Sequence, residues 1–413
     1  MSRWKQMSVS VVVAVLAGVP TGAPAQPAPG ADFYEQKCGR CHVAYDPTDY
    51  PAAEWPGIVS SMRAQAGLTT RDMEALAEYL ATESGGDQQR AESSGPSVGG
   101  YLYTEYFRTP EKARNFDIHY LAVYLSGSVN DKISYVGEFE LEHGGTGGDN
   151  TFVEQAYIDW WLAPNVAVKI GAILTPFNRF DEFHDPLMNY TITRPQVSRE
   201  IGVSAWKDVG VDVHGYVNLN QQTSLGFDAY AINGLGAGPN LRGSRQYRDN
   251  NEELALGGRL NLVYRDVLEV GGSAYRGAWD ADGKHDLTMF GGYAMLQTDV
   301  ADFYGEWEKA TSENPAPAGK GEMSGYFVQA SRLIEKRYRP TLRYGSLDYL
   351  DTGDLLGRDS GRGDRDVKEL VVALSYYPTT RAALKIEYAF LGEGDRLPEK
   401  DNDQLGLQAA VKF

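Results

Sequence analysis

The sequence predicts a small all-helical module followed by a transmembrane, antiparallel β-barrel of about sixteen strands. The chain contains 46 Gly, 26 Tyr and 7 Trp beside a hydrophobic fraction of 42%, as in barrels in which only every second residue faces lipid. From residue 99 onward, apolar residues recur with period two, and short and long connections alternate between the predicted strands. A soluble β-sandwich is the alternative, and it explains neither the strand lengths nor this alternation.

Residues 1–25 have the three parts of a secretory signal peptide. Arg3 and Lys5 give a charged start, Val9–Val19 is apolar, and Ala23–Ala25 offers a small-residue cleavage site. The apolar stretch is too short to cross a bilayer core of about 30 Å. We therefore expect the mature chain outside the cytoplasm, where cysteines can be oxidised or can carry a covalent cofactor.

The charge of the chain limits its partners. The formal net charge is −17, and it becomes −19 when the two basic residues of the signal peptide are subtracted. This excess argues against nucleic acid or an anionic surface as a partner. No later segment approaches twenty consecutive apolar residues, so membrane-spanning helices are not predicted.

The only two cysteines lie in the stretch Cys38-Gly39-Arg40-Cys41-His42. At this spacing two thiols can add to the vinyl groups of haem, and the adjacent imidazole can bind the iron. A disulfide and half of a zinc site are the alternatives, but the chain has no second cysteine pair for zinc. We predict one covalent haem c on Cys38 and Cys41, with His42 as the proximal iron ligand.

Residues 26–84 are expected to form the small helical module around this haem. Helices are predicted from Asp32 to Lys37, from Trp55 to Ala66 and from Thr70 to Thr82. A module of about 60 residues cannot bury a large core, so a covalent cofactor is expected to stabilise it. Residues 85–98 show no periodicity and are predicted to be a flexible linker.

Three assignments of the distal haem ligand are open from the sequence. Met62 lies in the second predicted helix, and an axial Met would give an electron-transfer haem with a raised potential. Met73 is the second candidate, and an open coordination site is the third. Both methionines could instead fill the small core. We predict Met62 as the distal ligand, with Trp55 and Tyr79 packing against the haem.

The barrel is expected to occupy residues 99–413. The predicted strands are 99–107, 116–128, 132–143, 151–163, 165–174, 208–217, 222–233, 253–264, 267–278, 285–298, 300–311, 323–334, 337–349, 366–378, 382–393 and 402–413. Short connections follow the even strands, and long ones, such as 175–207, follow odd strands. Because outer-membrane barrels have short periplasmic turns and long external loops, both barrel ends and the module are expected on the periplasmic side.

Strand 382–393 and the final strand alternate most regularly. Leu384, Ile386, Tyr388 and Phe390 are expected to face lipid, and Lys385 and Glu387 the lumen. The final strand alternates in the same way and ends on the aromatic Phe413. These features favour a membrane barrel over a soluble sheet protein.

Charged residues repeat on one face of three predicted strands. The members are Glu138, Glu140 and Glu142; Arg337, Arg339 and Arg343; and Glu306 with Glu308. Such ladders are typical of a solvated channel wall, and a field that selects ionic solutes is the functional alternative. The long loop 175–207 is expected to fold inward as a constriction, with an external flap as the alternative. The remaining histidines show no metal-binding spacing.

This layout resembles the fused monohaem cytochrome–porins, bacterial outer-membrane electron-transfer proteins that include extracellular iron oxidases. The resemblance covers the whole chain: signal, one haem motif from Cys38 to His42, linker, and a barrel ending at Phe413. It implies electron uptake across the outer membrane, although Phe33–Lys37 before the motif departs from the iron-oxidase pattern. The barrel with its long loop is similar to phosphate-selective-type porins, and Trp55–Met62 is similar to small c-type cytochromes with a helical Met ligand.

Three functions remain open from the sequence. The first is an electron conduit between an extracellular donor or acceptor and periplasmic carriers, with iron oxidase activity if the donor is Fe(II). The second is a solute- or anion-selective porin tethered to a periplasmic cytochrome c module. The third is a haem enzyme with an open iron site. The expected surroundings are outer-membrane lipid, with the module on the periplasmic side or inside the lumen. Such a barrel could assemble as a homotrimer.

Overall fold

The computed structural model covers the full chain. It describes residues 30–38, 44–50, 52, 55, 58–59, 70–84, 96–110, 115–130, 132–145, 151–220, 222–238, 240–265, 267–316, 319–349, 355–357, 366–393 and 400–413. The predicted signal peptide, most of the predicted linker, and the site residues Cys41, His42 and Met62 lie outside these ranges. Among the described residues, no helix has both the length and the apolar character needed to cross a membrane.

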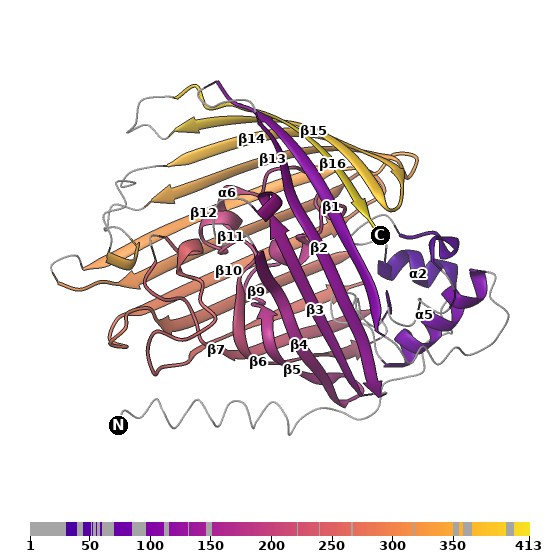
Figure 1. The fold of residues 1–413 in the computed structure, drawn as a ribbon, viewed down its shortest axis with the longest axis horizontal. Helices are drawn as coiled ribbons and strands as arrows, with labels where there is room; N and C mark the ends of the chain where they lie inside the picture. The colour runs from indigo at the N-terminus through magenta and orange to yellow at the C-terminus, as the bar shows by residue number, and fades with distance from the viewer. Residues whose placement is uncertain are drawn as a thin grey trace.

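Sixteen strands form the larger part of the molecule (Figure 1). Their bounds are β1 (Ser97–Arg108), β2 (Asn115–Asn130), β3 (Ile133–Glu142), β4 (Thr151–Ala163), β5 (Val166–Leu174), β6 (Lys207–Asn220), β7 (Thr223–Ile232), β8 (Ala255–Tyr264), β9 (Leu268–Ala278), β10 (Asp286–Gln297), β11 (Asp302–Glu313), β12 (Lys320–Ser331), β13 (Tyr338–Tyr349), β14 (Val367–Thr379), β15 (Ala382–Glu393) and β16 (Gln404–Lys412). The predicted number of strands is confirmed, and no predicted strand end differs by more than three residues.

Every strand pairs with its neighbours in sequence, and β1 pairs with β16 to close the barrel. The closing pair is antiparallel and runs from Tyr101 opposite Lys412 to Arg108 opposite Leu405. Gly100 and Phe413 extend it, because each donates its N–H to the carbonyl of the other, at 2.8 and 2.9 Å. A side chain at residue 100 would run into the Phe413 ring and the Ala122 carbonyl. Glycine there lets the terminal Phe close the seam.

The outer surface of the barrel is apolar, as the alternation of β15 predicts. Leu384, Ile386 and Phe390 are between 46% and 51% exposed, whereas Lys385 and Glu387 are 3% and 1% exposed. Strand side chains alternate between two faces, so the exposed face is the lipid-facing one and the buried face lines the lumen.

The described part of the N-terminal module contains α2 (Ala31–Cys38), the 3-10 turn η1 (Pro47–Asp49) and α5 (Thr70–Glu83). The first and third predicted helices are confirmed. Of the second, only Trp55, Ile58 and Val59 are described, and they are helical. Figure 1 shows α2 and α5 beside the end of β16, at the end of the barrel that carries the short turns.

Besides the small core of the N-terminal module, a larger hydrophobic core fills part of the barrel interior. Phe177, Phe180, Val197 and Ile201 come from the long segment between β5 and β6, and they pack with Trp206 against inward-facing wall residues. This segment also contains the 3-10 turn η3 (Phe180–Phe183) and the short helix α6 (Gln196–Glu200). The loop 175–207 therefore folds into the barrel, as predicted, and does not form an external flap.

Candidate functional site

Cys38 is the last residue of α2, and its side chain packs half-buried against the module core. Tyr34 lies one helical turn earlier, is 4% exposed and donates its hydroxyl to the Tyr45 carbonyl at 2.8 Å. Burial raises the pKa of Tyr34, and negative charge on Cys38 adds to the effect. The first predicted haem-bonding thiol is thus held beside a buried phenol that remains a hydrogen-bond donor.

The surroundings of Cys38 are rich in aromatic rings. Trp55 is 1% exposed, donates its indole N–H to the Pro47 carbonyl at 3.0 Å, and meets Tyr34 and Tyr50 edge-on. Tyr79 of α5 packs on Tyr34 with ring centroids 6.3 Å apart. An apolar, aromatic wall beside the first thiol suits the flat face of a haem. The described residues of the module therefore fit the cofactor that the motif implies.

Met73, the second candidate for the distal ligand, lies on α5 and is partly buried against the module core. This position agrees with the alternative in which Met73 fills the core. Met62 lies outside the described residues and stays a prediction.

Two turns of the barrel fix the module at its mouth. Thr380 donates its hydroxyl to the Asp49 carboxylate, and Arg381 donates to the Asp49 carbonyl at 3.3 Å. The Arg381 guanidinium also lies 4.7 Å from the centre of the Tyr50 ring. A further contact, between Lys336 and Glu35 at 2.7 Å, is exposed on both sides and adds little stability.

Lys412 joins the module to the inward loop. Its ammonium group lies 3.0 Å from the Asp185 carboxylate of the loop and 5.7 Å from the centre of the Tyr45 ring of the module. Lys37, which directly precedes Cys38, lines a lumenal cavity of about 130 Å³ together with Trp161, His184 and His214. The helix that carries Cys38 therefore borders a cavity inside the barrel.

The inward loop is bound to the barrel wall from several strands. Arg343 of β13 is fully buried and donates to the Thr191 hydroxyl at 2.6 Å, the Thr193 carbonyl at 2.7 Å and the Thr193 hydroxyl at 2.9 Å. Glu387 of β15 accepts the N–H groups of Ile192 and Thr193. On β11, two strands from β13, Glu306 accepts two further N–H groups of the loop, from residues 179 and 180.

These contacts correct the interpretation of the charged ladders as solvated walls. Arg343, Glu138, Glu306 and Glu308 are at most 4% exposed, because the loop covers or approaches them. Arg337 is exposed and precedes β13, so it does not share a face with the inward-facing Arg339 and Arg343. Period-two spacing predicted which wall residues point inward, but it could not predict what would fill the interior.

Replacing Arg343 with alanine is expected to release the loop and raise single-channel conductance in planar bilayers. The substitution removes three charge-assisted hydrogen bonds from a buried site, a cost of about 3 kcal/mol or more. Arg343→Lys keeps the charge and is expected to hold the loop partly in place, with a smaller rise in conductance. Arg332→Ala, in the exposed connection after β12, is the control. Equal conductance in Arg343→Ala and the control would contradict this role of the loop.

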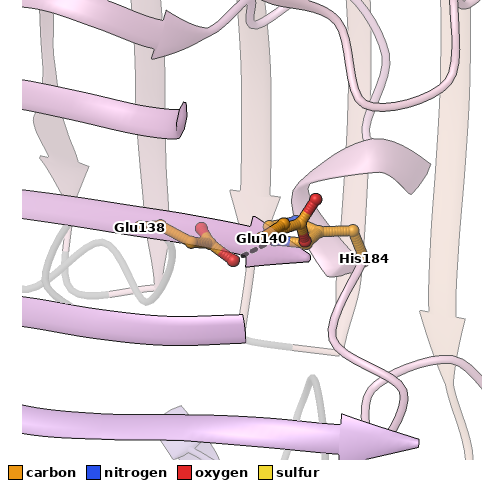
Figure 2. Close-up of side chains that lie close together, drawn as sticks. All are labelled: Glu138, Glu140 and His184. Carbon is orange, nitrogen blue, oxygen red and sulfur yellow. Dashed lines mark hydrogen bonds and ion pairs between the residues drawn. The ribbon is translucent and has the colours of Figure 1, made fainter. Parts of the chain in front are cut away.

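A compact group of ionisable side chains lies where the loop meets β3 (Figure 2). His184 Nε2 is 3.1 Å from Glu138 Oε1, and Glu140 Oε1 accepts the Tyr101 hydroxyl at 2.6 Å. Burial by itself lowers the pKa of His184, but the charge and hydrogen bond of Glu138, with the charges of Glu154 and Glu140, raise it to about 10. The surrounding carboxyl groups therefore stabilise the protonated, positively charged form of His184.

Only part of this group can be predicted from the sequence. The alternation of side chains along β3 predicts that Glu138 and Glu140 point inward, but His184 lies in a loop without any metal-binding spacing. The inward direction of Glu154 cannot be predicted in this way, because its neighbour Gln155 also points inward and breaks the alternation. The register shift between β3 and β4 at Glu138–Phe139 leaves Glu154 unpaired as a β-bulge, and bulges turn side chains to a new direction. No local signal in the sequence marks this bulge.

Known proteins are similar to both parts of the chain, the N-terminal module and the barrel. A family model described as dihaem cytochrome c matches residues 34–112, a range that contains the haem motif and ends just beyond β1. An uncharacterized protein of Aquifex aeolicus is 26% identical over 349 residues, which cover 75% of this chain and 78% of the relative.

Three solved structures have a similar barrel. An anion-selective porin from Comamonas acidovorans has a TM-score of 0.56 at 14% identity, covering 77% of this chain and 99% of the porin. A loop-deletion mutant of OmpT from Vibrio cholerae has a TM-score of 0.54 at 15% identity, with the same coverage. The channel DcaP of Acinetobacter baumannii has a TM-score of 0.53 at 13% identity, covering 78% of this chain and 99% of the channel.

At these identities the similarity concerns the fold, and this fold points to the outer membrane. The cytochrome match agrees with the Cys38–His42 motif and supports haem c binding. The chain is therefore a cytochrome c domain fused to a porin-like, sixteen-stranded barrel.

Proposed function

We propose that the protein transfers electrons between an extracellular donor or acceptor and periplasmic carriers through a single c-type haem at the periplasmic mouth of the barrel. The observation that carries the proposal is the position of α2. Cys38 ends this helix, and the adjacent Lys37 borders the lumenal cavity. A haem bonded to Cys38 and Cys41 would lie between the lumen and the periplasm.

The number of haems follows from the composition. The family model describes a dihaem cytochrome, but the chain has two cysteines, enough for one covalent attachment motif. Our proposal is therefore a single haem, ligated by His42 and Met62, in a module that is helical throughout. The signal peptide of residues 1–25 would export the chain, and a homotrimer remains one assembly open to the barrel.

A single haem cannot exchange electrons across the full membrane by tunnelling. The partner from outside must then be small enough to enter the lumen and approach the haem from the cavity beside Lys37. Fe(II) is the donor that the resemblance to iron oxidases suggests; it would lose one electron to ferric haem and leave as Fe(III). A periplasmic carrier would take the electron from the exposed side of the module.

Proteoliposomes with the module facing inward, and with an oxidised soluble cytochrome enclosed as acceptor, test the proposal. Ferrous ion and ferrocyanide, added outside, provide donors of opposite charge. We expect reduction of the enclosed acceptor to need the haem and to fall to the background of empty liposomes in Cys38→Ala/Cys41→Ala. Protease digestion of the module from outside reports the orientation.

The alternative is a solute- or anion-selective porin tethered to a periplasmic cytochrome c module. On this alternative, a small donor crosses the lumen itself and reduces the enclosed acceptor at the same rate with or without haem. That result, together with conductance indifferent to haem loss, would exclude the electron-transfer proposal.

Met62→Ala is expected to remove the thioether-to-iron band at the red end of the haem spectrum and to lower the reduction potential. The reason is that an axial thioether stabilises the ferrous state. Met73→Ala is the matched control, because Met73 packs against the module core. A spectrum that changes only in Met73→Ala would reverse the assignment. A spectrum unchanged in both variants would indicate an open site and favour a haem enzyme.

A further inference from the structure

Glu138, Glu140 and His184 bring three potential metal-ligating groups together inside the barrel (Figure 2). One ligand atom from each residue lies within 4.8 Å of the other two. Among the described residues, these three form the one group of possible metal ligands that meets this distance. Ligands bound at about 2.1 Å to one ion lie at most about 4.2 Å apart. Small rotamer changes of the two glutamates would close this difference.

A second observation concerns Glu154, which the bulge in β4 turns into the lumen. Glu154 is fully buried, its Oε2 contacts the Lys207 ammonium group, and its carboxylate also lies within hydrogen-bond reach of the Glu140 carboxyl group. Its carboxylate interacts electrostatically with Glu140 and His184. Two carboxyl groups this close repel each other when both are ionised, and a cation placed between them would relieve this repulsion.

The charge of the group also favours a cation. Three carboxyl groups, Glu138, Glu140 and Glu154, meet here, and Lys207 and His184 are the basic side chains in direct contact with them. The neighbouring Arg194 pairs with Asp181 at 2.9 Å and also acts electrostatically on Glu154.

We propose that Glu138, Glu140 and His184, assisted by Glu154, bind one divalent first-row metal ion in the barrel lumen. Carboxylate oxygen and imidazole nitrogen are ligands suited to Mn(II), Fe(II) and Zn(II). The two wall ligands come from β3 and the third from the inward loop. The bound ion cross-links loop and wall. This inference goes beyond electron transfer and does not need the haem.

Titration with Mn(II) alone, followed by room-temperature electron paramagnetic resonance of the folded holoprotein in detergent, tests the site. We expect one bound Mn(II) per barrel and a loss of affinity of at least about tenfold in Glu140→Gln or His184→Gln. Amide exchange around residue 184 should slow when Mn(II) is added to the unaltered protein. Heat-modifiable migration in gels confirms that each variant barrel is folded.

His214→Gln is the matched control. His214 lines the same cavity and pairs with Asp159 at 3.0 Å, but this pair does not belong to the three-ligand group. Its Mn(II) affinity should be unchanged, as should that of the haem-free Cys38→Ala/Cys41→Ala variant, even if electron transfer fails. Absence of Mn(II) binding, equal loss in His214→Gln, or displacement of Mn(II) by equimolar Mg(II) would overturn the proposal.

Discussion

Alanine at both Cys38 and Cys41 is expected to yield protein without covalent haem. The chain contains no other cysteine, so no thioether bond can form elsewhere. Intact-mass spectrometry and the pyridine haemochrome spectrum should give one haem per chain in the unaltered protein and none in the variant. The expected effect is complete loss of attachment, not a change in affinity.

Loss of the haem should also destabilise the module while leaving the barrel intact. The described module core is small and built around Tyr34, Trp55, Leu76 and Leu80, and small domains of this kind depend on a covalent cofactor. Amide exchange in α5 is therefore expected to become fast, with barrel strands unchanged. An unaltered protein whose mass shows a Cys38–Cys41 disulfide and no haem would contradict the haem assignment and the electron-transfer proposal with it.

The second large effect is expected at the junction between module and barrel. Arg381→Ala/Lys412→Ala removes the hydrogen bond to Asp49, the contact with the Tyr50 ring, and the bridge from Tyr45 to Asp185. A cation over an aromatic ring contributes about 0.5–1 kcal/mol, and a hydrogen bond to a charged group about 1.5–3 kcal/mol. A combined loss of about 3 kcal/mol would reduce the docking equilibrium by about two orders of magnitude.

Hydrogen exchange followed by mass spectrometry measures this change directly. Peptides covering residues 44–50 and the turn 379–381 should exchange faster in the double variant, and β3 should not. Arg265→Ala is the matched control. It lies after β8 at the same end of the barrel, with its guanidinium 5.3 Å from the Tyr264 ring and its side chain bonded to Gln222. Neither of these partners belongs to the module. Equal exchange in all three proteins would mean that the linker alone holds the module.

The two measurements together link position to function. If docking places the haem at the lumen, the Arg381→Ala/Lys412→Ala variant should keep its haem and spectrum but reduce the enclosed acceptor more slowly with external donors. If the module acts only as a tethered periplasmic carrier, undocking should leave this rate unchanged.

The sequence by itself determined the barrel and the attachment motif. Each strand is encoded locally, because side chains alternate every two residues and turns need particular short sequences. The final strand with Phe413, and the lumenal Lys385 and Glu387, could therefore be placed without a structure. The predicted haem motif from Cys38 to His42 is also local, since two thiols and one imidazole would have to meet a single planar ligand.

Only the tertiary structure decided what fills the barrel and where the module sits. The Arg343 contacts to Thr191 and Thr193, and the Lys412 contacts to Asp185 and Tyr45, join residues more than a hundred positions apart. Neither follows from a periodic pattern. The bulge at Glu154 turns one side chain of β4 toward the lumen. These features depend on the fit between a loop and a closed wall, because burial and pairing energies, not local propensity, select the arrangement.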